Sequence, residues 1–530
     1  MKLERTKNAT RNIIFGVALK LYQIVLPFVM RTVMIYTIGV QYLGLNSLFT
    51  SILQVLNIAE LGVGSAMVFS MYEPITKDDN KTICALMNLY KWYYRIIGGV
   101  ILVFGLILLP FIPNLISDKV PSDMNVYVLY LLNLLATVFT YWLFAFRNSI
   151  LQAYQRTDVT SKVTLGTDTF KYLLQVVGLC VFHNYYYYVI ALLVSQILTN
   201  LITAYFSKKM YPQYDPMGKL PKSEVKKINR RIKDLFTSKL GATIVNSADT
   251  IVISAFLGLT ALAIYQNYFF VITSLIALMT MVYSACLAGI GNSIIVETLE
   301  KNLNDLKRFT VLILWISTVC TSCLLCLYQP FIAFWVGKDL QMEYAIVICI
   351  CIYFFIYEIN QLLCIYKDAA GLWHKDRFRP LVTALSNLAM NIIMVQFWGL
   401  YGVVLSTVVT MGIIGMPWII YNLFTVLFKK EHMVDYLKLL FTFAIVGGII
   451  CAVTTIVCNL ITFNSNLITL VVRGIVCVVV SNVLFIAVFR KNKRFGEAIY
   501  LIEKMCKGKF PLHKVISKEL KRKFIVIKSD

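Results

Sequence analysis

Long apolar runs separated by short polar loops fill almost the whole chain. Fourteen runs are long enough to cross a bilayer, whose hydrocarbon core needs about 20 mostly apolar residues per helix. Backbone groups cannot stay unpaired in hydrocarbon, so each run is predicted to be a transmembrane helix. The sequence therefore predicts an all-α polytopic membrane protein, with spans at residues 12–38, 43–71, 92–113, 126–147, 163–183, 186–207, 238–258, 260–295, 309–335, 343–366, 380–398, 401–428, 438–460 and 467–489.

The basic residues predict how the chain is oriented in the membrane. A net charge of +23 is compatible with nucleic-acid binding. However, nearly all lysines and arginines lie in alternate loops and at the two ends, above all in residues 208–233 and 490–528. This bias is typical of the cytoplasmic side of a membrane protein. We therefore predict that both termini are cytoplasmic, and we expect no nucleic-acid partner.

The two halves of the chain resemble each other at an offset of about 219 residues. The matching pairs are Gly39 with Gly258, Arg156 with Lys375, and Thr164 with Thr383. One offset that holds across many helices indicates an internal repeat, and transporters often place their cargo site between such repeats. We predict an N-lobe of six helices (1–207), a basic cytoplasmic linker (208–237), a C-lobe of six helices (238–428) related to the first by a pseudo-two-fold axis, two further helices (429–489) and a basic cytoplasmic tail (490–530).

Polar residues recur at helical spacing on several spans, which predicts a watery cavity. For a single Asn or Thr, hydrogen bonding between helices is the simpler explanation. An arginine at mid-depth costs about 2.5–3.5 kcal/mol to insert, so Arg31 needs a partner or water. The predicted substrate-binding residues are Arg31, Lys20, Gln23, Asn57, Glu60, Gln54, Lys171, Arg147, Asn246, Asp249, Asn387 and Asn391.

The charged candidates leave several alternatives open. Glu60 or Asp249 could neutralise Arg31, Lys171 could pair with Asp168 three residues earlier, and Lys20 could extend toward the inner surface. Three acidic residues are candidates for coupling transport to a sodium ion or a proton: Glu60, Asp249 and Glu358.

Enzymatic, metal and cofactor motifs are not found in the sequence. Cys320, Cys323 and Cys326 have the spacing of metal ligands, but they fall within one apolar span without a histidine, so we interpret them as small apolar side chains. The sequence contains no G-x-x-x-x-G-K-[ST] loop and no catalytic triad pattern. We therefore expect a transporter without a cofactor.

Residues 496–528 predict either an amphipathic helix on the inner leaflet or a solvated tail.

Residues 26–75, 146–163 and 398–409 resemble the Wzx-type polysaccharide flippases of the MOP transporter superfamily. The likeness extends over nearly the whole chain, and it supports a family more firmly than a substrate. The stretches are LPFVMRTVMIYTIGVQYLGLNSLFTSILQVLNIAELGVGSAMVFSMYEPI (26–75), FRNSILQAYQRTDVTSKV (146–163) and WGLYGVVLSTVV (398–409).

The resemblance implies a substrate and a cellular location. It implies that the cargo is an undecaprenyl-diphosphate-linked oligosaccharide, flipped between the leaflets of the bacterial cytoplasmic membrane by alternating access. Implied partners are membrane lipids, a polysaccharide polymerase and chain-length machinery. In the related lipid II flippases the last two helices form a groove for the lipid tail. The alternatives are a multidrug or cation antiporter of the related efflux branch and, with less support, a membrane-embedded polymerase or glycosyltransferase.

Overall fold

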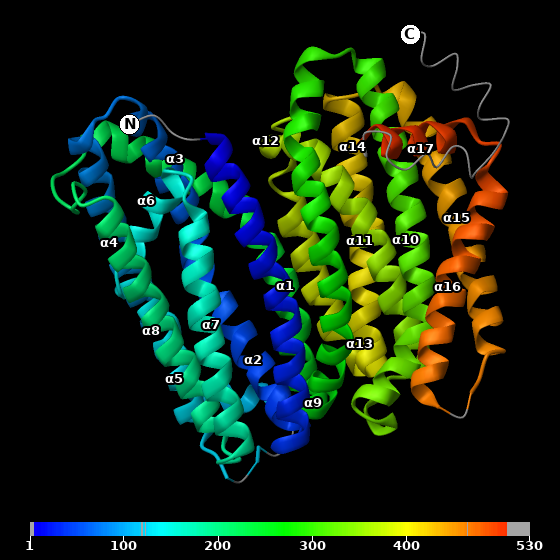
Figure 1. Ribbon diagram of the computed structural model, residues 1–530, viewed down its shortest axis with the longest axis horizontal. Helices are drawn as coiled ribbons and strands as arrows, with labels where there is room; N and C mark the ends of the chain where they lie inside the picture. The colour runs from blue at the N-terminus through cyan, green and yellow to red at the C-terminus, as the bar shows by residue number, and fades with distance from the viewer. Residues whose placement is uncertain (1–4, 118–119, 122, 464, 506–530) are drawn as a thin grey trace. The chain divides into compact units, whose positions relative to one another are not determined.

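The computed structural model describes residues 5–117, 120–121, 123–463 and 465–505 (Figure 1). Every regular element formed by these residues is a helix, which confirms the all-α prediction. The chain divides into two compact units, the first made of residues up to Gln266 together with Pro380–Leu400, and the second of Asn267–Arg379 and the residues from Tyr401 onward. The predicted boundaries of the lobes, linker and tail stay a prediction.

Eight helices belong entirely to the first unit, and two others contribute residues to both units. The eight are α1 (Arg5–Thr37), α2 (Val40–Leu56), α3 (Val63–Thr76), α4 (Asn80–Leu108), α5 (Val126–Trp142), α6 (Asn148–Ala153), α7 (Thr157–Cys180) and α8 (Tyr185–Met210). The shared helices are α9 (Lys222–Val296) and α13 (Arg379–Val409). Within this unit α7 packs against both α1 and α8.

The second unit is built around α10 (Leu299–Trp335), which packs against α11 (Tyr344–Ala369), α15 (Met433–Asn459) and α16 (Asn466–Phe489), as Figure 1 shows. Its core contains many buried aromatic rings, among them Phe443, Phe485 and Phe489. The remaining helices of this unit are α12 (Trp373–Asp376), α14 (Met416–Val426), which follows a π-helical turn, and α17 (Lys493–Met505).

Ten helical segments in the described part of the chain are long and apolar enough to cross a membrane, or eleven if the bent pair of α5 and the segment after it is one span. Two of them, Thr243–Val296 and Trp373–Val426, are 54 residues long. Each contains one glycine with a non-helical backbone, Gly258 or Gly399. Helix α7 carries four charged residues and is not among the ten. The polytopic character is confirmed, and the count of fourteen stays a prediction.

Gly39 and Gly258, which the predicted repeat pairs with each other, share one backbone conformation. Gly39 has φ 108° and ψ 164°, and Gly258 has φ 87° and ψ 178°. Glycine adopts positive φ readily, whereas a Cβ atom makes this conformation costly. The helix after Gly39 also comes very close to the chain after Gly258, because a Cβ added to Gly44 would lie 2.2 Å from the carbonyl oxygen of Leu259.

Two predicted spans contain breaks that the sequence analysis did not expect. The span 43–71 is divided into α2 and α3 by a 3₁₀ turn at Asn57–Glu60 and by Gly62, which is left-handed at φ 89°. The span 126–147 ends as an α-helix at Trp142, and Phe144 then turns the chain by 47° with φ 58°. A continuous helical period therefore does not predict which way side chains point after Leu56 or after Trp142.

The start of the C-terminal tail is a helix packed on the second unit. Phe495, Ala498 and Ile499 of α17 are buried in the core of that unit. Arg308 of α10 and Arg494 both form ion pairs with Glu497, at 3.2 and 3.3 Å. Residues 506–530 lie outside the described part of the chain, so the choice between a surface helix and a solvated tail stays open for them.

Candidate functional site

Arg31 and Lys171 line one cavity of about 200 Å³ within the first unit. We call it the Arg31 cavity. It is formed by α1, α2, α7 and α8, and its lining residues are Pro27, Met30, Arg31, Met34, Leu43, Asn46, Thr50, Lys171, Tyr172, Gln175, Tyr188 and Leu192.

The polar residues reach this cavity because each helix presents them one turn apart. Asn46 and Thr50 are four residues apart on α2, as are Lys171 and Gln175 on α7, so each pair lies on one helix face. On α1, Pro27 precedes Arg31 by the same spacing. These residues of α1, α2 and α7 therefore line one cavity.

Two cations and an unsatisfied acceptor give the Arg31 cavity its chemistry. Lys171 pairs with Asp168 at 2.7 Å, as the sequence analysis allowed, and still lines the cavity. Arg31 donates from Nη1 to the backbone carbonyl of Gln266 at 3.4 Å, a contact that leaves its positive charge in place. Gln175 donates to the carbonyl of Tyr188 at 3.2 Å, while its buried Oε1 has no hydrogen-bond partner among the described residues. Such a site suits an anion that also carries hydroxyl donors.

Glu60 lines a second cavity in the first unit, of about 440 Å³, which we call the Glu60 cavity. The Glu60 carboxylate accepts hydrogen bonds from Tyr94 Oη and from the backbone N–H of Gly64, both at 3.3 Å. Gly64 lies in the first turn of α3, where the helix dipole favours a negative charge. The lining residues of the two cavities do not overlap, although the sequence analysis placed Glu60 and Arg31 in one site.

Asp249 lies in a buried polar cluster that α9 and α13 form within the first unit. Asn391 donates to Asp249 Oδ1 at 2.6 Å and to Asn387 Oδ1 at 3.4 Å, and Tyr265 donates to Asp249 Oδ2 at 3.3 Å. Asn387 and Asn391 are fully buried, and Asp249 is 6% exposed. Three predicted site residues thus form one buried, hydrogen-bonded cluster.

Glu358 is buried in the second unit. Tyr283 donates to its Oε2 at 2.6 Å, and Glu358 Oε1 has no hydrogen-bond partner among the described residues. Burial of a carboxyl group with one free oxygen is typical of a group that can take up a proton or a cation.

The remaining predicted residues have other surroundings. Arg147 is buried and forms an ion pair with Asp215 of the linker at 2.6 Å. Asn57 accepts a hydrogen bond from Tyr141 at 3.1 Å. Gln23 and Gln54 are exposed, Lys20 is half-buried, and none of these five lines the Arg31 cavity. Asn246 belongs to α9, but its side chain lies outside the described residues.

An apolar groove of about 650 Å³ lies in the second unit between α10, α11 and α15. Ile348, Ile352 and Phe355 line it from α11, and Ile445, Ala452 and Ile456 line it from α15. An apolar groove on membrane helices offers space for a hydrocarbon chain.

The family model described as "Polysaccharide biosynthesis protein" matches residues 9–287, more than half of the chain. The chain belongs to this family. The matched region contains both cavities and the Asp249 residue itself. No curated protein sequence matches the chain.

Solved structures of other proteins resemble this chain in fold. One is the lipid II flippase MurJ in an inward closed conformation, with a TM-score of 0.65, 17% identity, and 90% of this chain and 99% of that chain covered. Another is an inward-facing multidrug resistance MATE family transporter of the MOP superfamily, with a TM-score of 0.60, 14% identity and coverages of 79% and 99%. These likenesses show the fold, and the family match favours polysaccharide biosynthesis over drug efflux.

Tyrosines that contact the site could not be identified from the sequence. The predicted substrate-binding residues include Arg31 and Lys171 of this cavity, but no tyrosine. In the structure Tyr188 lines the Arg31 cavity, and Tyr185 donates to Asn46 Oδ1 at 3.1 Å. The sequence gives little indication of these contacts, because they join α8 to α2, which are far apart along the chain.

Proposed function

We propose that this protein is a flippase that moves undecaprenyl-diphosphate-linked oligosaccharides from the inner to the outer leaflet of the bacterial cytoplasmic membrane. The Arg31 cavity is the observation that carries the proposal. It combines Arg31 and Lys171 with amide, hydroxyl and phenol groups inside membrane helices. A diphosphate needs cations in a hydrated site, and a guanidinium binds phosphate oxygens in pairs.

The other lining groups suit the sugar next to the diphosphate. Gln175 Oε1 is an acceptor without a partner among the described residues, and Asn46 and Thr50 add polar groups on the facing helix. A cavity of about 200 Å³ accommodates a headgroup fragment, so the rest of the oligosaccharide would extend beyond it.

The apolar groove is proposed to hold part of the undecaprenyl chain. The resemblance to lipid II flippases implies such a groove at the last two helices, and here α15 lines the groove together with α10 and α11. The undecaprenyl chain would enter this groove from bilayer hydrocarbon and not from water, so close packing against the apolar side chains, and not the hydrophobic effect, would hold it. The groove therefore supports a lipid-linked cargo over a free sugar.

Energy for transport is proposed to come from the membrane potential, an ion, or both. With the cell interior negative, outward movement of an anion releases about 2.3 kcal/mol per charge for every 100 mV. Of the three coupling candidates, Glu60 lines a cavity, whereas Asp249 and Glu358 are 6% and 0% exposed. We therefore propose Glu60 as the first candidate for ion coupling. We also propose that both termini are cytoplasmic, and that a polysaccharide polymerase and chain-length proteins are partners.

Depletion of the protein from living cells tests this function. Lipid-linked repeat units are expected to accumulate on the inner leaflet, while the efflux of a cationic dye such as ethidium is expected to stay unchanged. Loss of dye efflux with normal surface polysaccharide would instead identify a drug antiporter. Loss of polymerisation with normal flipping would identify a polymerase.

A further inference from the structure

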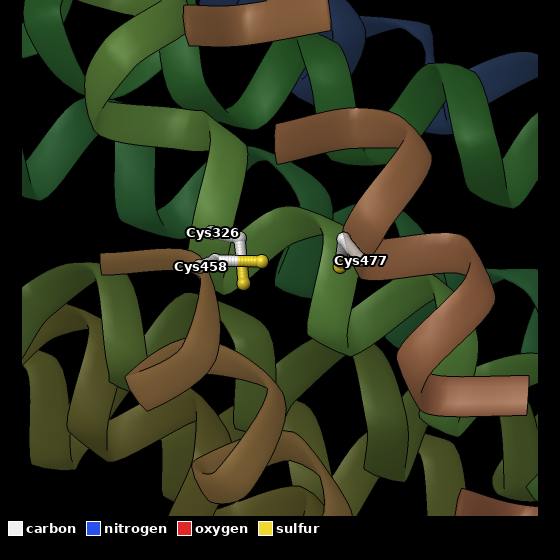
Figure 2. A group of neighbouring side chains, drawn as sticks. All are labelled: Cys326, Cys458 and Cys477. Atoms are coloured by element: carbon white, nitrogen blue, oxygen red, sulfur yellow. The ribbon is translucent and has the colours of Figure 1, made fainter. Parts of the chain in front are cut away.

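Three cysteine thiols from three helices converge in the second unit. Cys326 of α10, Cys458 of α15 and Cys477 of α16 have Sγ atoms that all lie within 4.8 Å of one another. Figure 2 shows the three side chains meeting between separate ribbons. All three residues are buried, at 2% exposure or less. Sequence spacing groups Cys326 only with Cys320 and Cys323, which lie on the same helix.

We propose that Cys326, Cys458 and Cys477 form a binding site for a thiophilic metal ion of the Cu(I) or Zn(II) class. Thiolates are the protein ligands that these ions prefer. Metal–sulfur bonds of about 2.3 Å place three sulfurs around one ion about 4 Å apart, so the thiols need to move by less than about 1 Å.

The number of ligands favours a metal ion over a disulfide. A disulfide joins two sulfurs and leaves the third thiol unused, whereas a metal ion uses all three. Cu(I) is stable with three sulfur ligands, while Zn(II) prefers four and would keep one position open. Cys323, one turn before Cys326, packs against the cluster and offers a further thiol.

The surroundings support binding at this place. Cys326 Sγ lies 3.7 Å from Thr455 Oγ1, and Cys458 Sγ lies 3.8 Å from the backbone carbonyl of Arg473. Arg473 precedes Cys477 by one turn of α16, and its Nε donates to the backbone carbonyl of Ile461 at 2.8 Å, three residues after Cys458. The thiols would release their protons to water on binding. A bound ion would connect α15 and α16 to α10.

Titration of the purified full-length protein with metal alone tests the site. The reduced protein is titrated with Cu(I) against a chromophoric chelator, and separately with Zn(II). Wild type is expected to bind about one ion per chain, and the thermal midpoint is expected to rise when metal is added. X-ray absorption is expected to report sulfur ligands at about 2.3 Å.

Two kinds of variant serve as controls. Cys458→Ser and Cys477→Ser, alone and combined with Cys326→Ser, are expected to lose the bound ion. Cys180→Ser, at an exposed position of α7, is expected to keep it. Gel filtration and thermal melting without metal show that each variant is folded. Absence of binding in wild type, or unchanged binding in the triple variant, would overturn the proposal.

Thiol counting separates the proposal from a disulfide. All 13 cysteines of the denatured, metal-free protein are expected to react with an alkylating reagent. Loss of two reactive thiols, mapped by mass spectrometry to Cys326, Cys458 or Cys477, would show a disulfide and overturn the metal site.

Discussion

Arg31 of α1 and Lys171 of α7 line the same cavity, although they lie on different helices and far apart in the sequence. Two cations facing one space repel each other, and a bound anion relieves that repulsion. Lys171 is partly compensated by Asp168 at 2.7 Å. The pair therefore predicts a preference for an anionic headgroup, and each member makes a separate prediction.

The charge of Lys171 is expected to contribute to headgroup binding. Lys171→Gln should weaken the binding of undecaprenyl diphosphate to protein in lipid nanodiscs by about tenfold, which corresponds to about 1.4 kcal/mol. Asp168→Asn is the matched control, because it breaks the same ion pair and leaves the cation. Binding should be unchanged or tighter in this control. Equal losses in both variants would show that the ion pair is purely structural.

Glu60 is expected to couple transport to an ion. Glu60→Gln should keep the binding of undecaprenyl diphosphate near the wild-type value, because the Glu60 and Arg31 cavities share no lining residue. Transport into proteoliposomes should lose its dependence on a sodium or proton gradient. Gln54→Ala, at an exposed position of the preceding helix, provides the control. Unaltered gradient dependence in Glu60→Gln would move coupling to Asp249 or Glu358.

Close backbone packing at Gly44 is expected to make alanine destabilising there. A Cβ atom at this position would lie 2.2 Å from the carbonyl oxygen of Leu259, and overpacking of this kind costs about 1–3 kcal/mol. A Cβ atom added to Gly166 of α7 would have no neighbouring atom within 4 Å, so Gly166→Ala should leave the thermal midpoint unchanged or raise it. Equal midpoints for the two variants would contradict the close approach.

A buried ion pair before the predicted span 163–183 is expected to stabilise the fold in a pH-dependent way. Burial alone raises the pKa of the Asp158 carboxyl, but Arg156 at 2.8 Å and Lys162 at 3.4 Å hold this pKa below its usual value. The contribution is therefore complete above the unfolded pKa of about 3.9, and it is lost as the pH falls through the lower folded pKa.

Thermal melting checks this prediction. Asp158→Asn should reduce the free energy of unfolding by about 1–3 kcal/mol at pH 7, with a smaller loss at pH 3. The exposed pair of Glu73 and Lys77 should contribute much less, so Glu73→Gln is the matched control. A pH-independent loss in Asp158→Asn would contradict the ion-pair account.

Sequence spacing indicates which side chains share a helix face where a helix is continuous, and it loses that information where the helix breaks. Asn46 and Thr50, like Lys171 and Gln175, follow one helical face, so their spacing was sufficient to bring them together. Glu60 would fall on the same face as Asn46 and Thr50 if the helix continued past Leu56. The 3₁₀ turn and the left-handed Gly62 instead direct it into another cavity.

Contacts between separate helices could not be predicted from spacing. The approach of Tyr188 to the Arg31 cavity depends on how α8 packs beside α7, and a single sequence does not contain that information. The same holds for Cys458 and Cys477, which meet Cys326 only in the folded chain. Gly39 and Gly258 both have positive φ, and the repeat that pairs them stays a prediction.

Transport by Arg31 variants tests the central claim most directly. Purified wild type, Arg31→Ala and Arg31→Lys are incorporated at equal density into proteoliposomes, and the flipping of an undecaprenyl-diphosphate-linked oligosaccharide is measured. A hydrogen bond to a charged group contributes about 1.5–3 kcal/mol, so the alanine variant should flip about 10–100 times more slowly. The lysine variant should retain intermediate activity, because it keeps the charge without the paired donors. Wild-type flipping by Arg31→Ala would contradict the account.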